Sequence, residues 1–263
     1  MTGERIAFMK LENESIDLYP IQLNPSLLNP DSVLKPQAYP ALYCELAEQH
    51  LTAHDAGSDK TMEFGVAWVL ISLSVDVFKP AVAPGLLQAK TWKSGRKGPY
   101  FLRDFVFTDK CGEVCFRGTS YSVLLHLDTR RICRDKSIPF FSLTADQEPL
   151  TLGYPSWKHA YGQGEDLIAG KLERRALRNV ENSFLDLLGH VNNTRYAEFV
   201  YDAMTDNEIL KLKELSRMEI YFASELRRGE SFDIAACRDE NRLFFRGRKC
   251  NGGETSFDLV LYL

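Results

Sequence analysis

Residues 186–196 read DLLGHVNNTRY and are the most informative stretch of the chain. An acid, a glycine and a histidine precede two asparagines, and an amphipathic run follows them. The apolar residues of that run are spaced i, i+3, i+4 and i+7, which predicts one buried helix face, made of Tyr196, Phe199, Val200 and Ala203. Asn192 or Asn193 suits the N-cap of this helix. Asp186 and His190 would then lie in the loop before the helix, where its positive end can stabilise an oxygen that gains negative charge.

The overall composition describes an ordinary globular protein. The 263 residues suffice for one large domain or two smaller ones, and 44% are hydrophobic and 26% charged. A net charge of −4 argues against a nucleic-acid partner. No apolar run approaches the roughly 20 residues that a bilayer span requires, and the first residues show no secretion signal. We therefore expect a cytoplasmic protein without membrane insertion.

The six cysteines are scattered and contain no C-x-x-C pair. Zinc sites usually show paired spacing, and disulfide frameworks belong to small secreted domains. We expect reduced cysteines that lie mostly in the core, with no metal and no cofactor.

The order of predicted elements repeats along the chain. Residues 5–11 are predicted to form a first strand, and four prolines within 20–36 predict an ordered loop without regular structure. From Tyr39 an apolar stripe predicts a helix, namely Tyr39, Leu42, Tyr43, Leu46, Ala47 and Leu51. Alternating strands follow. The second half repeats strand, helix and four antiparallel strands, with the turn at Gly112-Glu113 matched by Gly253-Glu254.

This repeat predicts an α+β fold of two fused units, each an antiparallel sheet wrapped around a central helix. The expected divisions are an N-terminal unit (residues 1–132), a linker (133–168) and a C-terminal unit (169–263). The linker is rich in proline and glycine but also contains aromatic residues such as Trp157 and Tyr161. We therefore expect it to pack along the surface.

The string His190-Val191-Asn192-Asn193 with Tyr196, preceded by Asp186, resembles the signature of acyl-acyl carrier protein (acyl-ACP) thioesterases, which are double hotdog enzymes. The first half is similar to the family at several further motifs, which are Ala67-Trp68-Val69-Leu70, Gly98-Pro99, Arg103-Asp104-Phe105, Gly118-Thr119-Ser120 and LDTRR at 127–131. The resemblance is closer to the bacterial branch than to the longer plant enzymes.

The resemblance implies the catalytic residues. The family carries an Asp-x-Asn-x-His string and a glutamate on the following sheet, and these match Asp186, His190 and Glu225. Leu188 replaces the asparagine, which is a departure because leucine cannot hydrogen-bond. Leu226 follows the glutamate where plant members place a cysteine, which disfavours a cysteine nucleophile.

Thioester hydrolysis needs a base or nucleophile and donors for the carbonyl oxygen. Either carboxylate could serve as base or nucleophile, with His190 hydrogen-bonded to water or carbonyl and helix N–H groups forming the oxyanion site. The resemblance implies that the N-terminal unit forms the acyl-chain tunnel. The expected substrate-binding residues are Asn192, Asn193, Trp68 and Trp92.

The implied function is release of free fatty acid from acyl carrier protein in fatty acid biosynthesis. Two alternatives remain open at this point, an acyl-CoA thioesterase and a non-catalytic acyl-binding protein whose site decayed at Leu188. The partner would be acyl carrier protein bearing an acyl-phosphopantetheine, and a homodimer is left open. Because that carrier is acidic, basic clusters could dock it, either Lys90, Lys93, Arg96 and Lys97 or Lys171, Arg174, Arg175 and Arg178, although both could be ordinary solvated charges.

Overall fold

The structure is a computed structural model that describes residues 18–263 except 81, 143–147, 163–167 and 169–170. The strand expected at residues 5–11 lies outside the described residues. The strands are β1 (Tyr19–Leu23), β2 (Val66–Val77), β3 (Gly85–Lys97), β4 (Tyr100–Thr108), β5 (Val114–His126), β6 (Glu173–Asn179), β7 (Arg217–Phe222), β8 (Ser231–Asp239), β9 (Arg242–Lys249) and β10 (Thr255–Tyr262). The α-helices are α2 (Ala38–Ala53), α3 (Ser58–Glu63), α4 (Trp157–Tyr161), α6 (Asn193–Asp202) and α7 (Asp206–Leu210). Short 3₁₀ helices are η1 (Pro25–Leu27), η2 (Pro139–Ser142), η3 (Asn182–Phe184) and η4 (Lys211–Glu214).

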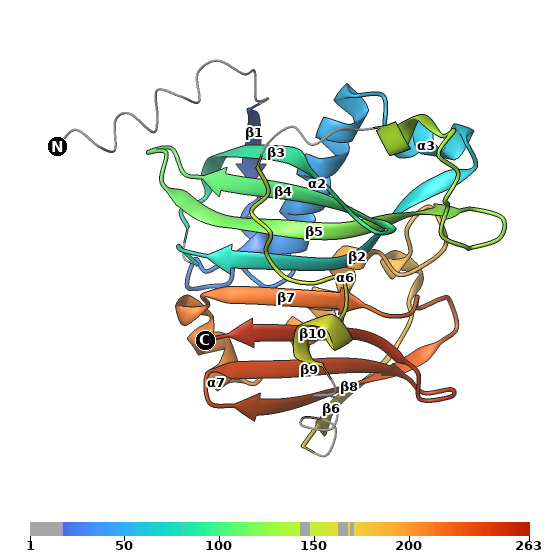
Figure 1. The fold of residues 1–263 in the computed structure, drawn as a ribbon. Coiled ribbons are helices and arrows are strands. Elements are labelled where there is room, and N and C mark those ends of the chain that lie inside the picture. Colours follow the sequence, from blue (N-terminus) through green and yellow to red (C-terminus); the bar gives the residue numbers. More distant parts are fainter. Residues whose placement is uncertain (1–17, 81, 143–147, 163–167, 169–170) are drawn as a thin grey trace.

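The ten strands in the described part of the chain join one antiparallel sheet in the order β1-β3-β4-β5-β2-β7-β10-β9-β8-β6. The second half of this order reverses the first, so that β6 corresponds to β1, β7 to β2 and β10 to β5. Figure 1 shows the two halves meeting where β2 runs beside β7. The predicted pair of fused hotdog units is confirmed, and their sheets are continuous.

The two long helices pack on one face of this sheet, as Figure 1 shows. The apolar stripe of α2 is buried, and all of it except Leu51 lies in the same core cluster as Tyr196, Phe199 and Val200 of α6. Ala203, the C-cap of α6, is half-buried and packs against the same cluster. No α-helix in the described part of the chain is long and apolar enough to cross a bilayer.

Strand β1 corrects the prediction for residues 20–36, which expected only an irregular loop. Pro20 lies within β1 and pairs with Gln88 of β3. Proline lacks an N–H and is tolerated in a sheet only where that group faces outward. Strand β1 is at the edge of the sheet, where one side of the strand has no partner and a proline can be accommodated.

The linker crosses the face of the sheet that lies opposite the helices, as its yellow-green trace shows in Figure 1. Trp157 of α4 is 6% exposed and packs against Tyr221 and Phe244. The Tyr161 hydroxyl donates to the buried Glu219 carboxylate at 2.6 Å. Trp157 and Tyr161 therefore attach this part of the linker to the second half of the sheet.

The hairpin turns also repeat between the two units. Gly112 and Gly253 both have positive φ (81° and 67°), a conformation that glycine adopts without steric cost. Cys111 and Cys250 occupy these turns and are exposed. The other four cysteines lie in or against the core, as expected of most of them, with Cys115, Cys133 and Cys237 buried and Cys44 half-buried.

Candidate active site

The loop before α6 is held by the Asp186 side chain. Its Oδ1 accepts hydrogen bonds from the backbone N–H groups of Leu188 (2.8 Å) and His190 (3.4 Å). The Asp186 N–H in turn donates to the His190 carbonyl at 2.8 Å, and Gly189 supplies the positive φ of 76° that the turn requires. This tight turn fixes the direction in which the His190 side chain leaves the backbone.

Asn192 is the N-cap of α6, one of the two residues that the sequence offered for this position. Its Oδ1 accepts from the Thr194 N–H at 3.0 Å and from the Thr194 hydroxyl at 2.7 Å. One turn later, the hydroxyl of the buried Tyr196 accepts from the Leu226 N–H at 3.3 Å. The helix start is thereby tied to the segment that carries Glu225.

That segment follows β7 and lies against the loop of His190. The Val191 N–H donates to the Leu226 carbonyl at 2.9 Å, and His190 forms an isolated bridge with Arg227. These contacts place the Glu225 carboxylate beside the histidine ring.

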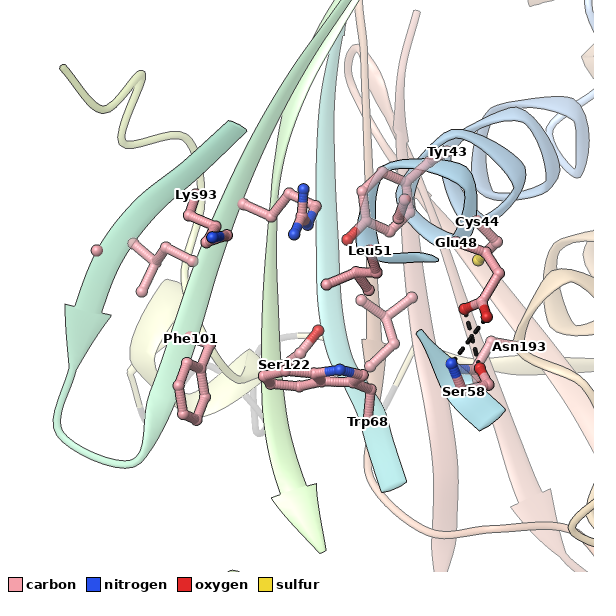
Figure 2. Close-up of a pocket in the computed structure, with 15 residues that line it drawn as sticks. Tyr43, Cys44, Glu48, Leu51, Ser58, Trp68, Lys93, Phe101, Ser122 and Asn193 are labelled. Carbon is pink, nitrogen blue, oxygen red and sulfur yellow. Dashed lines mark hydrogen bonds between the residues drawn. The ribbon is translucent and has the colours of Figure 1, made fainter. Parts of the chain in front are cut away.

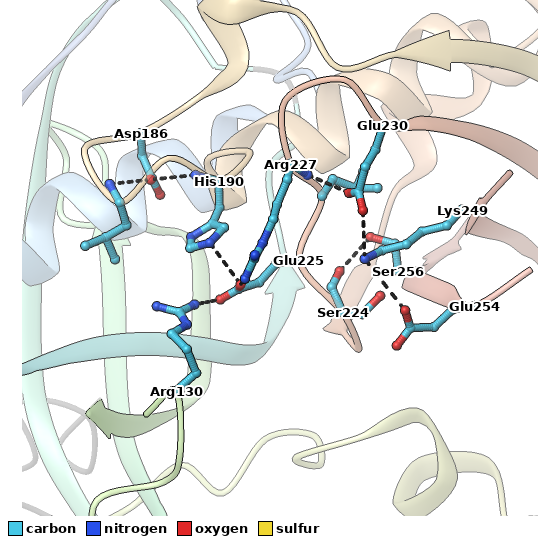
Figure 3. A network of polar contacts seen from close by, with 12 residues as sticks. Arg130, Asp186, His190, Ser224, Glu225, Arg227, Glu230, Lys249, Glu254 and Ser256 are labelled. Carbon is cyan, nitrogen blue, oxygen red and sulfur yellow. Dashed lines mark hydrogen bonds and ion pairs between the residues drawn. The ribbon is translucent and has the colours of Figure 1, made fainter. Parts of the chain in front are cut away.

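Glu225 is surrounded by donors, as Figure 3 shows. Its Oε2 lies 3.0 Å from His190 Nε2 and 3.4 Å from Arg227 Nη2. Its Oε1 forms an ion pair with Arg130, which comes from the loop after β5 in the other half of the chain. The His190 side chain is only 13% exposed, whereas that of Glu225 is 32% exposed.

The surroundings favour a neutral His190. Burial lowers the pKa of its ring below the ordinary value, and the positive charges of Arg130 and Arg227 lower it further, against smaller opposing effects of Asp186 and Glu230. A neutral ring that hydrogen-bonds to a carboxylate through Nε2 carries its proton on that nitrogen. Its Nδ1 is then free of a proton and can accept one.

The three predicted catalytic side chains line one cavity of about 350 Å³. Asp186, His190 and Glu225 share it with Leu188, which stands where the family has asparagine, and with Tyr196 and Phe222. The polar groups therefore converge on a space that is otherwise largely apolar, which is the usual form of a small-molecule site.

A second cavity, of about 190 Å³, lies beside α2 in the N-terminal half. Figure 2 shows Trp68, Phe101 and Leu51 around it. Trp68, Leu70 and Asn193 line both cavities, so the two spaces share a wall.

The four residues expected to bind substrate lie in different environments. Trp68 and Asn193 line both cavities, and the Trp68 indole donates to the Ala56 carbonyl at 3.0 Å. Asn192 serves as a helix cap and lines neither cavity. Trp92 is 7% exposed within β3 and also lines neither of them.

The two arginines on Glu225 were not among the predicted site residues. The sequence held a signal for Arg130, which belongs to the LDTRR motif that resembles the family, but nothing placed that motif beside the acid. Arg227 lies two positions after Glu225 in a segment whose path was unknown. Within the described ranges, no group of three or more His, Cys, Asp and Glu side chains is placed to hold a metal ion.

The fold and the site together define a double hotdog protein with two carboxylates and a histidine at one cavity. The model of the acyl-ACP thioesterase N-terminal domain matches residues 34–137, and that of the acyl-ACP thioesterase C-terminal domain matches residues 173–254. The chain therefore belongs to the acyl-ACP thioesterase family.

Individual relatives agree with this assignment. Oleoyl-acyl carrier protein thioesterase 2, chloroplastic, from Arabidopsis thaliana is 26% identical over 196 residues, which cover 72% of this chain and 52% of that protein. The chain thus spans about half the length of this curated relative. An acyl-ACP thioesterase from Bacteroides thetaiotaomicron has a similar structure (TM-score 0.76, 19% identity, 94% of this chain and 97% of that chain). The 12:0-ACP thioesterase from Umbellularia californica is also similar (TM-score 0.72, 18% identity, 95% and 97%).

Proposed function

We propose that the chain hydrolyses the thioester of acyl-ACP and releases a free fatty acid in fatty acid biosynthesis. The observation that carries this proposal is the His190–Glu225 pair, 3.0 Å apart, which lines one cavity together with Asp186. The family of the chain supports the same reaction and carrier.

In the proposed mechanism, His190 is the general base. Its Nδ1 takes a proton from a water molecule whose oxygen attacks the thioester carbonyl carbon, and the imidazolium that forms is stabilised by Glu225 through Nε2. The carbon–sulfur bond then breaks, and the proton passes to the leaving sulfur. The products are a carboxylic acid and the pantetheine thiol. Because both oxygens of Glu225 already accept from cations or His190, we assign this acid to orienting the histidine rather than attacking the substrate.

The carbonyl oxygen gains negative charge in the transition state and needs donors. Asn193 is the first residue of α6 and lines the catalytic cavity. The first N–H groups of a helix have no intrahelical acceptor. We assign the oxyanion contact to the Asn193 N–H, because the Thr194 N–H already donates to the Asn192 cap.

The acyl chain would extend from the catalytic cavity into the second cavity. The shared wall of Trp68, Leu70 and Asn193 supports this path, as do the apolar side chains of Leu51 and Phe101 farther along. In this arrangement the C-terminal unit supplies the chemistry, and the N-terminal unit holds the chain.

A direct assay tests the proposal. The purified protein is incubated with acyl-ACPs and acyl-CoAs of several chain lengths, and released fatty acid and thiol are measured, with His190→Ala as the inactive control. We expect faster release from acyl-ACP. Faster turnover of acyl-CoA would instead make the protein an acyl-CoA thioesterase. Binding of acyl carriers without release by the wild-type chain would make it an acyl-binding protein.

A further inference from the structure

The acid of the site is contacted by an arginine from the opposite half of the molecule. Arg130 lies beyond β5, in the N-terminal unit, yet its guanidinium pairs with Glu225 Oε1. His190 and Arg227 contact the other oxygen, Oε2. The Arg130 side chain is 28% exposed, so the pair is partly shielded from solvent. Figure 3 shows Arg130 approaching Glu225 from the side opposite Arg227.

The backbone at Arg130 is in an unfavourable conformation. Its φ is 56°, in the left-handed region that disfavours residues with a Cβ. The loop is closed by the Arg130 N–H, which donates to the His126 carbonyl at 3.0 Å, and by the His126 N–H, which donates to the Arg131 carbonyl at 2.9 Å. Glycine would fit this turn more easily. An arginine at such a position is what one expects where the side chain has a role that offsets the strain.

We propose that Arg130 is a positioning residue that orients the Glu225 carboxylate toward His190 across the boundary between the two units. This inference rests on the thioesterase function proposed above. By holding Oε1, Arg130 restricts rotation of the carboxylate and leaves Oε2 directed at His190 Nε2. Its charge is opposite to that of the carboxylate, which strengthens the contact between the two side chains.

Arg130 additionally acts on the histidine through its charge. The charged groups that face His190 are Arg130 and Arg227, which lower the pKa of its ring, and Asp186 and Glu230, which raise it. Glu225 contacts the ring directly. Loss of the Arg130 charge removes one lowering influence and leaves Glu225 less neutralised. Both changes move the pKa of His190 upward.

Four variants separate this role from a structural one. Arg130→Gln removes the charge, Arg130→Lys keeps it without the planar guanidinium, and Arg130→Gly removes the side chain while relieving the backbone. Arg131→Gln is the matched control, because Arg131 is the exposed neighbour in the same loop. Thermal unfolding of each variant shows whether it folds, and we expect Arg130→Gly to be at least as stable as the wild type.

We expect Arg130→Gln and Arg130→Gly to lower kcat about 10- to 100-fold with little change in KM, which is the range of losses seen when a reacting group is misplaced. Arg130→Lys should retain intermediate activity, and Arg131→Gln should match the wild type. The acid limb of the kcat/KM profile should move to higher pH in Arg130→Gln. A folded Arg130→Gly protein with wild-type kcat and an unmoved acid limb would overturn the proposal.

An NMR titration of the His190 ring in wild type and Arg130→Gln gives a second readout that does not need turnover. We expect a higher pKa for His190 in the variant, and equal values would contradict the proposed contact. If the wild type hydrolyses none of the thioesters tested, the thioesterase function fails, whereas this titration still decides whether Arg130 controls the histidine.

Discussion

His190 Nε2 lies 3.0 Å from Glu225 Oε2, and this contact joins the loop before α6 to the segment after β7. The backbone on each side reinforces it, because the Val191 N–H donates to the Leu226 carbonyl at 2.9 Å. Histidine and acid are therefore held as a unit rather than as two independent side chains. Residues that act as a unit show strongly non-additive effects on catalysis.

The first prediction follows from this coupling. His190→Ala and Glu225→Ala should each lower kcat, by about 10²- to 10⁴-fold if the histidine is the general base. The kcat of the double variant should be only slightly lower than that of the less active single variant, because either change destroys the same pair. Steady-state kinetics of the three proteins check this. Additive losses would indicate that Glu225 works independently of His190.

Asp186 has a different environment, and a different result is expected there. Its Oδ1 caps the turn by accepting from two backbone N–H groups, so Asp186→Ala should loosen the loop as well as remove the charge. Asp186→Asn keeps an acceptor oxygen and should preserve the turn. If the charge of Asp186 is needed for chemistry, both variants lose activity. If only the turn matters, Asp186→Asn should stay within about threefold of wild-type kcat while Asp186→Ala falls about 10- to 100-fold.

Local chemistry made much of this site predictable from the sequence. The helix of Tyr196 and its Asn192 cap follow from apolar spacing and capping preference, which act over a few residues. The repeat of strands and turns was visible for the same reason. Strand β1 was missed because Pro20 is permitted only at a sheet edge, and edge position is a tertiary property.

The contact between Arg130 and Glu225 could not be predicted from the sequence. It depends on the pairing of β2 with β7, which brings the ends of the two units together. Trp92 shows the same limit, because here the sequence suggested a residue that lines neither of the two cavities. Its position in a strand suggested a tunnel wall, but whether a strand residue faces a cavity depends on the packing around it.

The pH dependence of hydrolysis should reflect the lowered pKa of His190. The base must be neutral to accept a proton, so kcat/KM falls as pH drops through the pKa of the ring. Because burial and the two arginines hold that pKa below about 6.5, the ordinary value, activity should remain flat from neutral pH down to that region. Measuring kcat/KM from about pH 4.5 to about pH 8, in steps of about half a pH unit, checks this. Half-loss of activity at or above pH 6.5 would contradict it.

The acidic carrier should dock near the turn between β3 and β4. Arg96, Arg134 and Lys136 line one hollow there, and Lys93 and Phe101 of the same hairpin line the second cavity. In the other basic cluster, Arg175 and Arg178 already pair with Glu208 and Asp202. Arg134→Glu combined with Lys136→Glu should raise KM for acyl-ACP about tenfold, or ~1.4 kcal/mol.

Two comparisons make that docking prediction specific. Hydrolysis of a short acyl-pantetheine, which lacks the carrier, should be unaffected by the double variant. Arg174→Glu, an exposed charge reversal on the edge strand β6, is the matched control and should leave KM for acyl-ACP unchanged. Added salt should raise KM for acyl-ACP more in the wild type than in the double variant, because salt screens the charges that the double variant has lost. If Arg174→Glu alone raises KM, the carrier docks at the edge strand instead.

Leu188 marks where this chain departs from its family, and the structure makes restoration of the asparagine testable. The Leu188 side chain is half-buried and lines the catalytic cavity, while its N–H donates to Asp186 at 2.8 Å. Asparagine is no larger than leucine, and the backbone bond does not depend on the side chain, so Leu188→Asn should fold. An amide left without partners in an apolar setting destabilises by about 1–3 kcal/mol, and partial exposure should keep the cost near the lower end. Because His190, oriented by Glu225, contacts the water in the proposed mechanism, we expect activity to change by less than about tenfold, or ~1.4 kcal/mol of barrier. Steady-state kinetics together with thermal unfolding measure both effects. A rise of several hundredfold would show that the natural chain is an impaired hydrolase, and acyl binding without turnover would then be its better description.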